Sequence, residues 1–265
     1  WMVMEQGLAP KTCNLRLTAI RAFLEYAAQE YLWIMPVYTD ACTIVGVKTT
    51  NHAIEYFEPN EMTALLATPS GNNKTDRRNQ MMLIFLYDTA ARVAEARQVK
   101  VSDLHLDAEV PYVTLLGKGR KYRNIPLMDK TILHLKRFLK DFHGSELKTD
   151  MPLFYSKIHG QVHELSSDTF EKMIKRYAAQ CRAGGYPMPD NVHCHMIRKT
   201  RAMDLYREGV PLTHIQQLLG HENISTTSGF YAFATLDVLA KAMETVNPDN
   251  GVKSWSNPDT LERLY

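Results

Sequence analysis

The sequence predicts a mainly α protein with a small antiparallel β-sheet, an α+β fold. Apolar residues recur at helical spacing in most of the chain, as Leu17, Ile20 and Leu24 do within residues 12–33. Strand-forming residues gather where residues 112–116 and 122–125 flank a short glycine-rich turn. We therefore expect a helical chain with one evident β-hairpin.

Length and composition set the first limits on function. The 265 residues are 45% apolar and 23% charged, which favours one large globular domain or a domain with an appendage. The net charge of +2 gives no overall case for a polyanion, so a nucleic-acid interface must come from local charges. The four cysteines have no paired spacing, as is typical of a reducing, cytoplasmic location. No apolar run predicts a membrane span and the N-terminal residues show no signal-peptide pattern, so we expect no membrane partner.

The N-terminal part of the sequence predicts one helix and then a stretch without a period. Residues 12–33 keep helical spacing throughout. Residues 35–56 lose it, and we expect them to form an extended linker. Pro59 then suits the first position of a helix over residues 59–66, where a missing N–H has no cost.

The remainder alternates helical patterns with the hairpin. Helices are expected over residues 78–89 and 91–99, followed by an acidic turn at residues 102–103 and the hairpin. Further helices are expected over residues 129–142, 167–181, 195–207 and 212–219. Gly209 suits the C-terminal cap of the third of these helices. The chain ends with a linker from residue 247 and a short helix over residues 258–264.

Two charged positions stand out before the second half of the chain. Arg92 ends a nearly apolar segment at the start of a helix, and Glu95 three residues later can contact it, although a solvated ion pair explains the same spacing. Lys118 lies between two glycines at the hairpin tip, where the backbone can approach a ligand closely. With Arg120 and Lys121 it forms a candidate phosphate-contacting patch, and a merely soluble loop is the alternative.

The second half adds two histidines, an arginine and a tyrosine. His195 and Arg198 lie three apart and share a helical face. Zinc binding by residues 193–195 is disfavoured, because adjacent side chains point apart and no second pair lies nearby. His221 follows a tight turn, where a capping role is the alternative, and Tyr231 taken alone is most simply a core aromatic residue.

Together these residues form a set suited to phosphoryl transfer on a phosphodiester. Two guanidinium groups can clamp the non-bridging oxygens and neutralise the charge of the transition state. A lysine can protonate the leaving alkoxide, and histidines can move protons or hydrogen-bond the phosphate. A tyrosine hydroxyl is a suitable covalent nucleophile, and this chemistry requires no metal or other cofactor.

The same residues lie in motifs that resemble the tyrosine recombinase (phage integrase) family, in particular integrases of mobile elements. Residues 89–104 read TAARVAEARQVKVSDL, similar to the family's first box, and residues 117–127 read GKGRKYRNIPL, similar to its hairpin box. Residues 195–231, HMIRKTRAMDLYREGVPLTHIQQLLGHENISTTSGFY, are similar to its second box. The order Arg, Lys, HxxR, His, Tyr agrees, and the motifs span over half of the chain.

The resemblance implies a role for each matching residue. The two arginines bind the scissile phosphate, the lysine is the general acid for the 5′ oxygen, the first histidine assists proton transfer and the second hydrogen-bonds the phosphate. The tyrosine attacks to form a 3′-phosphotyrosyl link. The catalytic residues are thus Arg92, Lys118, His195, Arg198, His221 and Tyr231, with Glu95 supporting them. DNA contacts are expected from Lys11, Arg16, Arg120, Lys121 and Lys199.

The resemblance also implies the domain plan and the partners. Residues 1–44 correspond to the C-terminal part of a helical core-binding (DNA-binding) domain, residues 45–56 to a linker and residues 57–245 to the tyrosine-recombinase catalytic domain. The tail, residues 246–265, is expected to be exchanged between protomers. Expected partners are double-stranded DNA recombination sites, a homo-tetramer on synapsed DNA with a monomer or dimer in its absence, and accessory DNA-bending or directionality factors.

Three departures from the family pattern leave alternatives open. Ala91 replaces the usual glycine and Lys199 the usual histidine, and neither supplies the chemistry. Most relatives place the nucleophile nine residues after the LGH histidine, which falls on Phe230, whereas Tyr231 lies ten after it. Tyr231 is favoured, and a phenylalanine in place of the natural nucleophile is the alternative. The expected function is site-specific recombination for integration or excision of a mobile element; the alternative is a catalytically inactive or topoisomerase IB-like relative.

Overall fold

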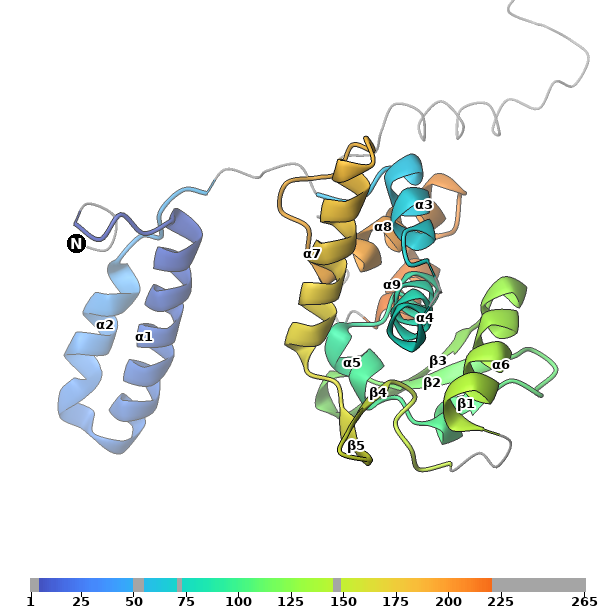
Figure 1. The fold of residues 1–265 in the computed structure, drawn as a ribbon. Coiled ribbons are helices and arrows are strands. Elements are labelled where there is room, and N and C mark those ends of the chain that lie inside the picture. The colour runs from blue at the N-terminus through green and yellow to red at the C-terminus, as the bar shows by residue number, and fades with distance from the viewer. Residues whose placement is uncertain (1–4, 50–54, 71–72, 145–148, 221–265) are drawn as a thin grey trace, which may run out of the picture. The chain divides into compact units, whose positions relative to one another are not determined.

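The structure is a computed structural model, and it describes residues 5–49, 55–70, 73–144 and 149–220 (Figure 1). The chain divides into two compact units, Trp1–Ala53 and Ile54–Tyr265. Helices predominate in both, and the sheets are small and antiparallel. The predicted α+β class is confirmed. No helix in the described ranges is long and apolar enough to cross a membrane.

The first unit is a pair of helices rather than a helix followed by an extended linker. Helix α1 is Pro10–Glu30, a 3-10 turn covers Leu32–Ile34, and helix α2 is Met35–Thr43. The expected single helix over residues 12–33 therefore breaks at Tyr31, whose backbone is extended. The expectation that residues 35–43 are extended was wrong, because a proline in the first turn of a helix removes no hydrogen bond.

Contacts from α1 explain why α2 forms without a clear period of its own. Arg21 donates from Nε to the carbonyl of Ala41 (2.9 Å) and from Nη2 to the carbonyl of Cys42 (3.2 Å) and to that of Ile44. These carbonyls lie at the C-terminal end of α2, where a helix leaves acceptors unpaired. The second helix is thus stabilised by a side chain of the first.

The second unit contains the remaining elements. Its described residues form the helices α3 (Pro59–Ala67), α4 (Lys74–Thr89), α5 (Val93–Gln98), α6 (Asp129–His143), α7 (Ser167–Ala183), α8 (Cys194–Arg207) and α9 (Leu212–Leu219). A three-stranded antiparallel sheet has the order β1 (Leu104–His105), β2 (Tyr112–Leu116), β3 (Tyr122–Pro126), and a separate hairpin pairs β4 (Tyr155–Ile158) with β5 (Gln161–Glu164). Short 3-10 turns cover Val101–Asp103 and Lys118–Arg120.

Most predicted elements of this unit are present, and the differences have local causes. Helix α4 begins at Lys74 rather than residue 78, because the Asn73 side chain accepts from the Asp76 N–H (2.8 Å) and caps a polar first turn. Helix α5 begins at Val93 rather than residue 91, after Ala90 turns the chain with φ of 49°. The hairpin β4–β5 was not predicted, because β5 is exposed throughout and shows no alternation.

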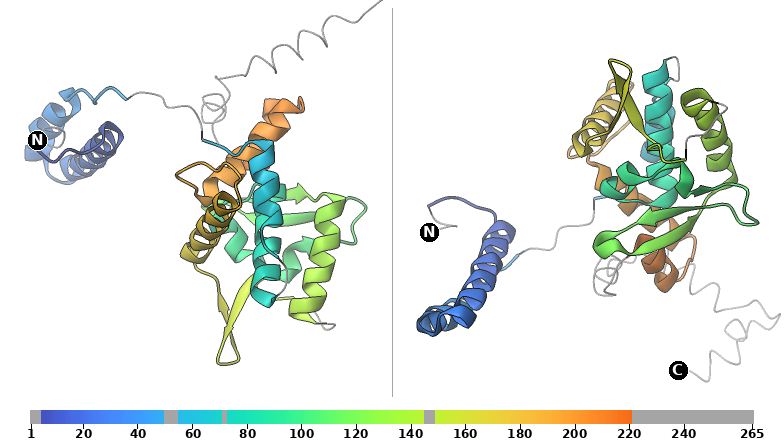
Figure 2. Two further views of the ribbon diagram at one scale, coloured as in Figure 1. Left: turned by 45° about the horizontal axis from the view of Figure 1, so that its top comes forward. Right: turned by 90° about the horizontal axis from the view of Figure 1, so that it is seen from below.

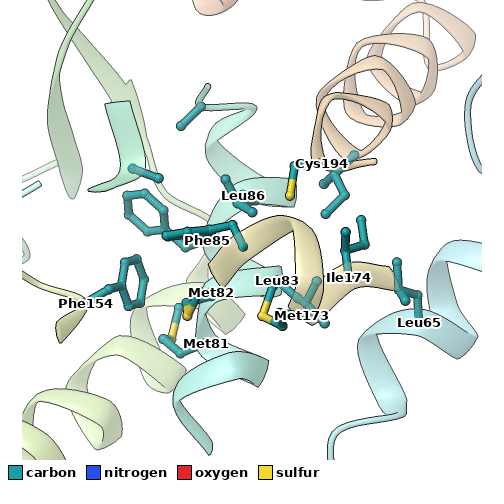
Figure 3. Close-up of a cluster of buried hydrophobic side chains, with 14 of the residues drawn as sticks. Leu65, Met81, Met82, Leu83, Phe85, Leu86, Phe154, Met173, Ile174 and Cys194 are labelled. Carbon is teal, nitrogen blue, oxygen red and sulfur yellow. The ribbon is translucent and has the colours of Figure 1, made fainter. Parts of the chain in front are cut away.

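The core of this unit surrounds α4. That helix packs against α3, α6 and α8, and Figure 2 shows it between α6 on one side and α7 and α8 on the other. Figure 3 shows the side chains that fill the space: Phe85 of α4 faces Phe154, and Met173 and Ile174 of α7 lie close to Leu83. The phenylalanine rings meet edge to face at 5.5 Å between centroids. The C-terminal end of α4 is therefore fixed firmly in the unit.

Candidate active site

Arg92 is placed by the turn that joins α4 to α5. Thr89 Oγ1 donates to the Phe85 carbonyl (2.6 Å) and accepts from the Ala91 N–H (3.2 Å), while Ala90 turns with a left-handed backbone. Arg92 then becomes the N-cap of α5. Its backbone N–H donates to Glu95 Oε2 (2.7 Å), and its Nη1 donates to Glu95 Oε1 (2.7 Å), a contact that the spacing of the two residues predicts.

Glu95 lies in the interior rather than on a solvated helix face. Its side chain is 4% exposed, and it accepts from Arg123 through two further hydrogen bonds, Nη1 to Oε1 (2.9 Å) and Nη2 to Oε2 (2.7 Å). Arg198 Nη1 lies 3.9 Å from Glu95 Oε2. Three guanidinium groups thus surround one buried carboxylate, and their charges exceed its own by two. We call Arg92, Glu95, Arg123 and Arg198 the arginine cluster.

The arginines determine the charge state of Glu95. Burial on its own would raise the pKa of this carboxyl group. Hydrogen bonds and positive charge from Arg123, together with the Arg92 N–H and side chain, outweigh burial and lower the pKa to about 2. Glu95 is therefore ionised at neutral pH and holds the three guanidinium groups in place.

The same three arginines bind the C-terminal end of α9. Arg123 Nε donates to the carbonyl of Leu218 (3.0 Å), Arg198 Nη2 to that of Leu219, and Arg92 Nη2 to that of Gly220 (3.4 Å). A helix ends with unpaired carbonyls and a partial negative charge, which positive side chains stabilise. The cluster therefore fixes the backbone that leads into residue 221.

Helix α8 supplies Arg198 and His195 from one face. Arg198 is 3% exposed and also donates from Nη1 to the Ala90 carbonyl (2.7 Å), which ties α8 to the turn after α4. His195 lies one turn earlier and is exposed as a residue. Desolvation by neighbouring atoms and then the charges of Arg198 and Lys199 lower the pKa of its imidazole to about 4. The ring is therefore neutral at pH 7 and able to accept a proton.

The hairpin presents its positive residues away from the protein interior. Lys118, Arg120 and Lys121 are all exposed at the tip that joins β2 to β3. Gly119 has φ of 74°, which a glycine adopts without strain, so the tip turns tightly. The base of the hairpin reaches the arginine cluster through Arg123 on β3. The tip and the cluster thus belong to one connected structure.

The structure brings together only part of the predicted site. Arg92, Glu95 and Arg198 meet, Lys118 is at the hairpin tip, and Lys199 on α8 is half-buried. Lys11 and Arg16 are exposed on α1, in the other unit. The predicted His221 and Tyr231, the alternative Phe230 and the tail over residues 246–265 lie outside the described residues. Within the described ranges, no group of three or more His, Cys, Asp or Glu side chains could hold a metal ion.

Arg123 belongs to this site, although no role is predicted for it from the sequence. It lies in the segment GKGRKYRNIPL, on the same side of β3 as the buried Ile125, and its side chain is 12% exposed. A positive residue on the inward side of a strand needs a buried partner. The alternation of inward and outward residues along β3 could therefore have indicated that Arg123 has a buried partner, although it does not reveal that the partner is Glu95.

The Phage integrase family is matched by residues 55–235 of this chain. The chain is 29% identical over 255 residues to "Putative integrase/recombinase y4rC" of Sinorhizobium fredii, which covers 96% of this chain and 74% of that relative. It is 28% identical over 238 residues to "Tyrosine recombinase XerC" of Staphylococcus epidermidis, covering 89% and 75%.

The fold is shared with a solved structure. The structure of the Tn1549 transposon integrase in complex with a circular intermediate DNA has a TM-score of 0.70 to this chain, with 19% identity, and covers 92% of this chain and 82% of that one. At that identity the likeness shows a shared fold. The matched region includes the arginine cluster, the hairpin and α9. The chain therefore belongs to the phage integrase family of tyrosine-type site-specific recombinases.

Proposed function

We propose that this chain cleaves and rejoins DNA at specific sites through a 3′-phosphotyrosyl intermediate, with Tyr231 as the nucleophile. One observation carries the proposal: Arg92 and Arg198 come from distant segments to one buried carboxylate, Glu95, at the end of α9. Excess positive charge in a low-dielectric setting favours the dianionic transition state of phosphoryl transfer. Arg92 keeps 35% of its side chain exposed, which leaves it accessible to a phosphate.

The proposed reaction balances without water or an added cofactor. The Tyr231 oxygen forms a bond to phosphorus as its proton passes to the neutral imidazole of His195, and the bond from phosphorus to the 5′ oxygen breaks. Lys118 gives a proton to that leaving oxygen, and Arg92 and Arg198 neutralise the non-bridging oxygens. His195 assists proton transfer, and His221 hydrogen-bonds the phosphate. Attack by the 5′ hydroxyl of another strand reverses the step and releases the tyrosine.

DNA binding is proposed to depend on local charge, since the net charge is only +2. Arg120 and Lys121 at the hairpin tip and Lys199 on α8 are the proposed contacts in the second unit. Lys11 and Arg16 on α1 are those in the first unit, where both are exposed. Residues 1–44 are proposed to be the C-terminal part of a helical core-binding domain and residues 57–245 the catalytic domain.

Integration or excision of a mobile element is the proposed setting, with a homo-tetramer acting on synapsed DNA. The names of the relatives support this choice, since they include a putative integrase/recombinase and a transposon integrase. The tail over residues 246–265 is the proposed segment exchanged between protomers. Accessory factors that bend DNA or set direction are proposed as further partners.

The direct test is covalent capture of DNA from a random pool. Nicked duplexes with a randomised central block are incubated with the protein, and DNA that stays attached after denaturation is recovered and sequenced. We expect a protein–DNA adduct that carries a shared sequence, because the nicked strand leaves and religation is prevented. A recovered pair of half-sites defines the target sequence. Finding that sequence next to the gene that encodes this protein would support the mobile-element setting.

Matched variants identify the nucleophile. Tyr231→Phe should abolish the adduct, and Tyr186→Phe, which alters an exposed tyrosine outside the motifs, should not. An adduct that persists in Tyr231→Phe would move the nucleophile elsewhere. Absence of an adduct in the parent chain together with its appearance in Phe230→Tyr would show that position 230 is the natural nucleophile.

A further inference from the structure

Arg123 joins three segments that are far apart in the sequence. It belongs to β3, binds both carboxylate oxygens of Glu95 in α5 (2.9 and 2.7 Å), and donates from Nε to the Leu218 carbonyl of α9 (3.0 Å). Its side chain is 12% exposed. A single guanidinium group therefore links the hairpin to the arginine cluster and to the helix end that precedes residue 221.

Two glycines leave the space that this side chain occupies. A Cβ atom at Gly220 would lie 3.1 Å from Arg123 Nη1 and 3.3 Å from its Cδ and Cζ. A Cβ atom at Gly117 would lie 3.3 Å from Arg123 Nη1. All of these distances are shorter than ordinary van der Waals contact, so larger residues at either position would displace the guanidinium group. The backbone on both sides is thus fitted closely around Arg123.

We propose that Arg123 is a positioning residue: it holds the hairpin that carries Lys118 in register with Arg92 and Arg198. This inference rests on the proposed function, since it concerns how the general acid reaches the leaving oxygen. The hairpin tip is exposed, and β1 pairs with β2 rather than with β3. Arg123 supplies the anchor on the β3 side, next to the turn that carries Lys118.

The anchor requires an arginine. Its planar guanidinium group makes two parallel bonds to a carboxylate and keeps Nε for a third acceptor. A lysine ammonium group at the same place carries the charge but offers a point contact in place of the fork. Arg123→Lys should therefore retain the charge near Glu95 and lose part of the anchoring, whereas Arg123→Met should lose both.

The first test needs no DNA and measures the anchor itself. Amide hydrogen exchange is compared in the parent chain, Arg123→Lys, Arg123→Met and the control Arg97→Met. Arg97 lies in α5 and, like Arg123, donates to a distant carbonyl, that of Leu165, but it is not part of the arginine cluster. We expect faster exchange at residues 112–126 and 212–220 in Arg123→Met, an intermediate rate in Arg123→Lys and parent rates there in the control. Unchanged exchange in both Arg123 variants would overturn the proposal.

The second test asks whether the anchor acts through Lys118. Single-turnover cleavage is measured on a captured site with an ordinary phosphodiester and on one whose 5′-bridging oxygen is replaced by sulfur. A thiolate leaves without protonation, so a fault in general-acid positioning disappears on the sulfur substrate. We expect Arg123→Met to slow cleavage of the ordinary site about 10²-fold, the cost of a small misplacement, and to cleave the sulfur site at close to the parent rate.

The outcomes of the second test separate the two proposals. If Arg123→Met slows cleavage of both substrates equally, a role through Lys118 is contradicted. Lys118→Ala is the reference variant, because the sulfur substrate should restore its cleavage rate fully. The apparent substrate affinity should be unchanged, since Arg123 does not contact DNA in this proposal. If the parent chain forms no adduct on any DNA, the recombinase proposal fails, and hydrogen exchange still decides whether Arg123 anchors the hairpin.

Discussion

Glu95 is the residue on which the candidate site depends most directly. It accepts hydrogen bonds from Arg92 and Arg123 and lies 3.9 Å from Arg198, while its side chain is almost completely buried. Removing one partner of a buried ionic network leaves the others uncompensated, which costs more than the network contributes. The site should therefore be more sensitive to loss of the carboxylate than to loss of any surface charge.

Because the pKa of Glu95 is lowered in the folded chain, its contribution to stability depends on pH. The carboxyl group titrates near 4.5 when unfolded and at about 2 in the folded chain, so its stabilisation is complete above pH 4.5 and is lost as the pH falls towards 2. We expect Glu95→Gln to lower the free energy of unfolding at pH 7 by roughly 3 kcal/mol and to flatten its decline between pH 4.5 and 2. Denaturant unfolding across that range measures both effects.

The control for this variant is Glu208→Gln, which alters an exposed carboxylate at the end of α8. Its unfolding free energy should stay within about 0.5 kcal/mol of the parent value. Equal losses in the two variants would show that burial of Glu95 among arginines has no special effect.

His195 gives a second prediction at the scale of the residue. Its imidazole titrates near 6.5 when unfolded and at about 4 in the folded chain, so the free protein keeps a neutral ring down to about pH 4. Its contribution to stability is complete above pH 6.5 and is lost as the pH falls towards 4. Nitrogen chemical shifts in an NMR titration, assigned by comparison with His195→Gln, measure the transition directly. A midpoint near 6.5 would contradict the prediction.

At the scale of the element, the end of α9 is fixed from outside the helix. Its last carbonyls bind arginines from β3, α8 and the start of α5, and Gly220 closes the helix with φ of 62°. Helix termini usually meet solvent or a local cap. In this chain the terminus meets the candidate site, so its position depends on the arginine cluster.

Two glycines with similar backbones test this dependence. Gly209 and Gly220 both have positive φ, but only Gly220 is crowded, since a Cβ at Gly209 would meet nothing within 4 Å. Gly209→Ala should cost about 1 kcal/mol, the cost of a left-handed backbone. Gly220→Ala should cost at least about 1 kcal/mol more, because the methyl group also displaces Arg123. The free energies of unfolding of the two variants, each compared with the parent chain, measure this difference. Equal losses of stability in Gly209→Ala and Gly220→Ala would show that Arg123 is not tightly held.

At the scale of the whole molecule, function is expected to arise from placement of charge rather than from its amount. Lysine and arginine total 31 against 29 aspartate and glutamate residues. The arginine cluster collects an excess of positive charge in the interior, and the hairpin tip collects more at the surface. A nearly neutral protein can therefore carry local concentrations of positive charge.

Salt dependence measures how many of these charges meet phosphate. Arg120→Ala should reduce the slope of the logarithm of DNA affinity against the logarithm of salt concentration by about 1, as expected for one lost phosphate contact. Lys140→Ala removes an exposed charge on α6, outside the motifs, and should leave the slope unchanged. Binding to a captured site at several salt concentrations gives both slopes. An unaltered slope in Arg120→Ala would remove the hairpin tip from the interface.

Elements whose pattern is local can be predicted directly from the amino-acid sequence. Residues 212–219 were predicted as a helix and form α9 with those bounds, and residues 112–116 form β2 as expected. The motifs around Arg92, Lys118 and Arg198 likewise identified a family that the comparisons support. Periodicity, turn residues and motif spacing depend on neighbours along the chain, so they can be read without coordinates.

Which distant residues act together depends on how the chain packs in three dimensions. Helix α2 forms because Arg21 of α1 binds its last carbonyls, although its own sequence has no clear period. Arg123 joins the site because folding brings Glu95 and Leu218, 28 and 95 residues away, within reach of one guanidinium group. The alternation of residues along a strand can indicate that a charged side chain faces inward. It cannot identify the partner of that charge, because the contact forms between segments that are distant in the sequence and meet only when the chain folds.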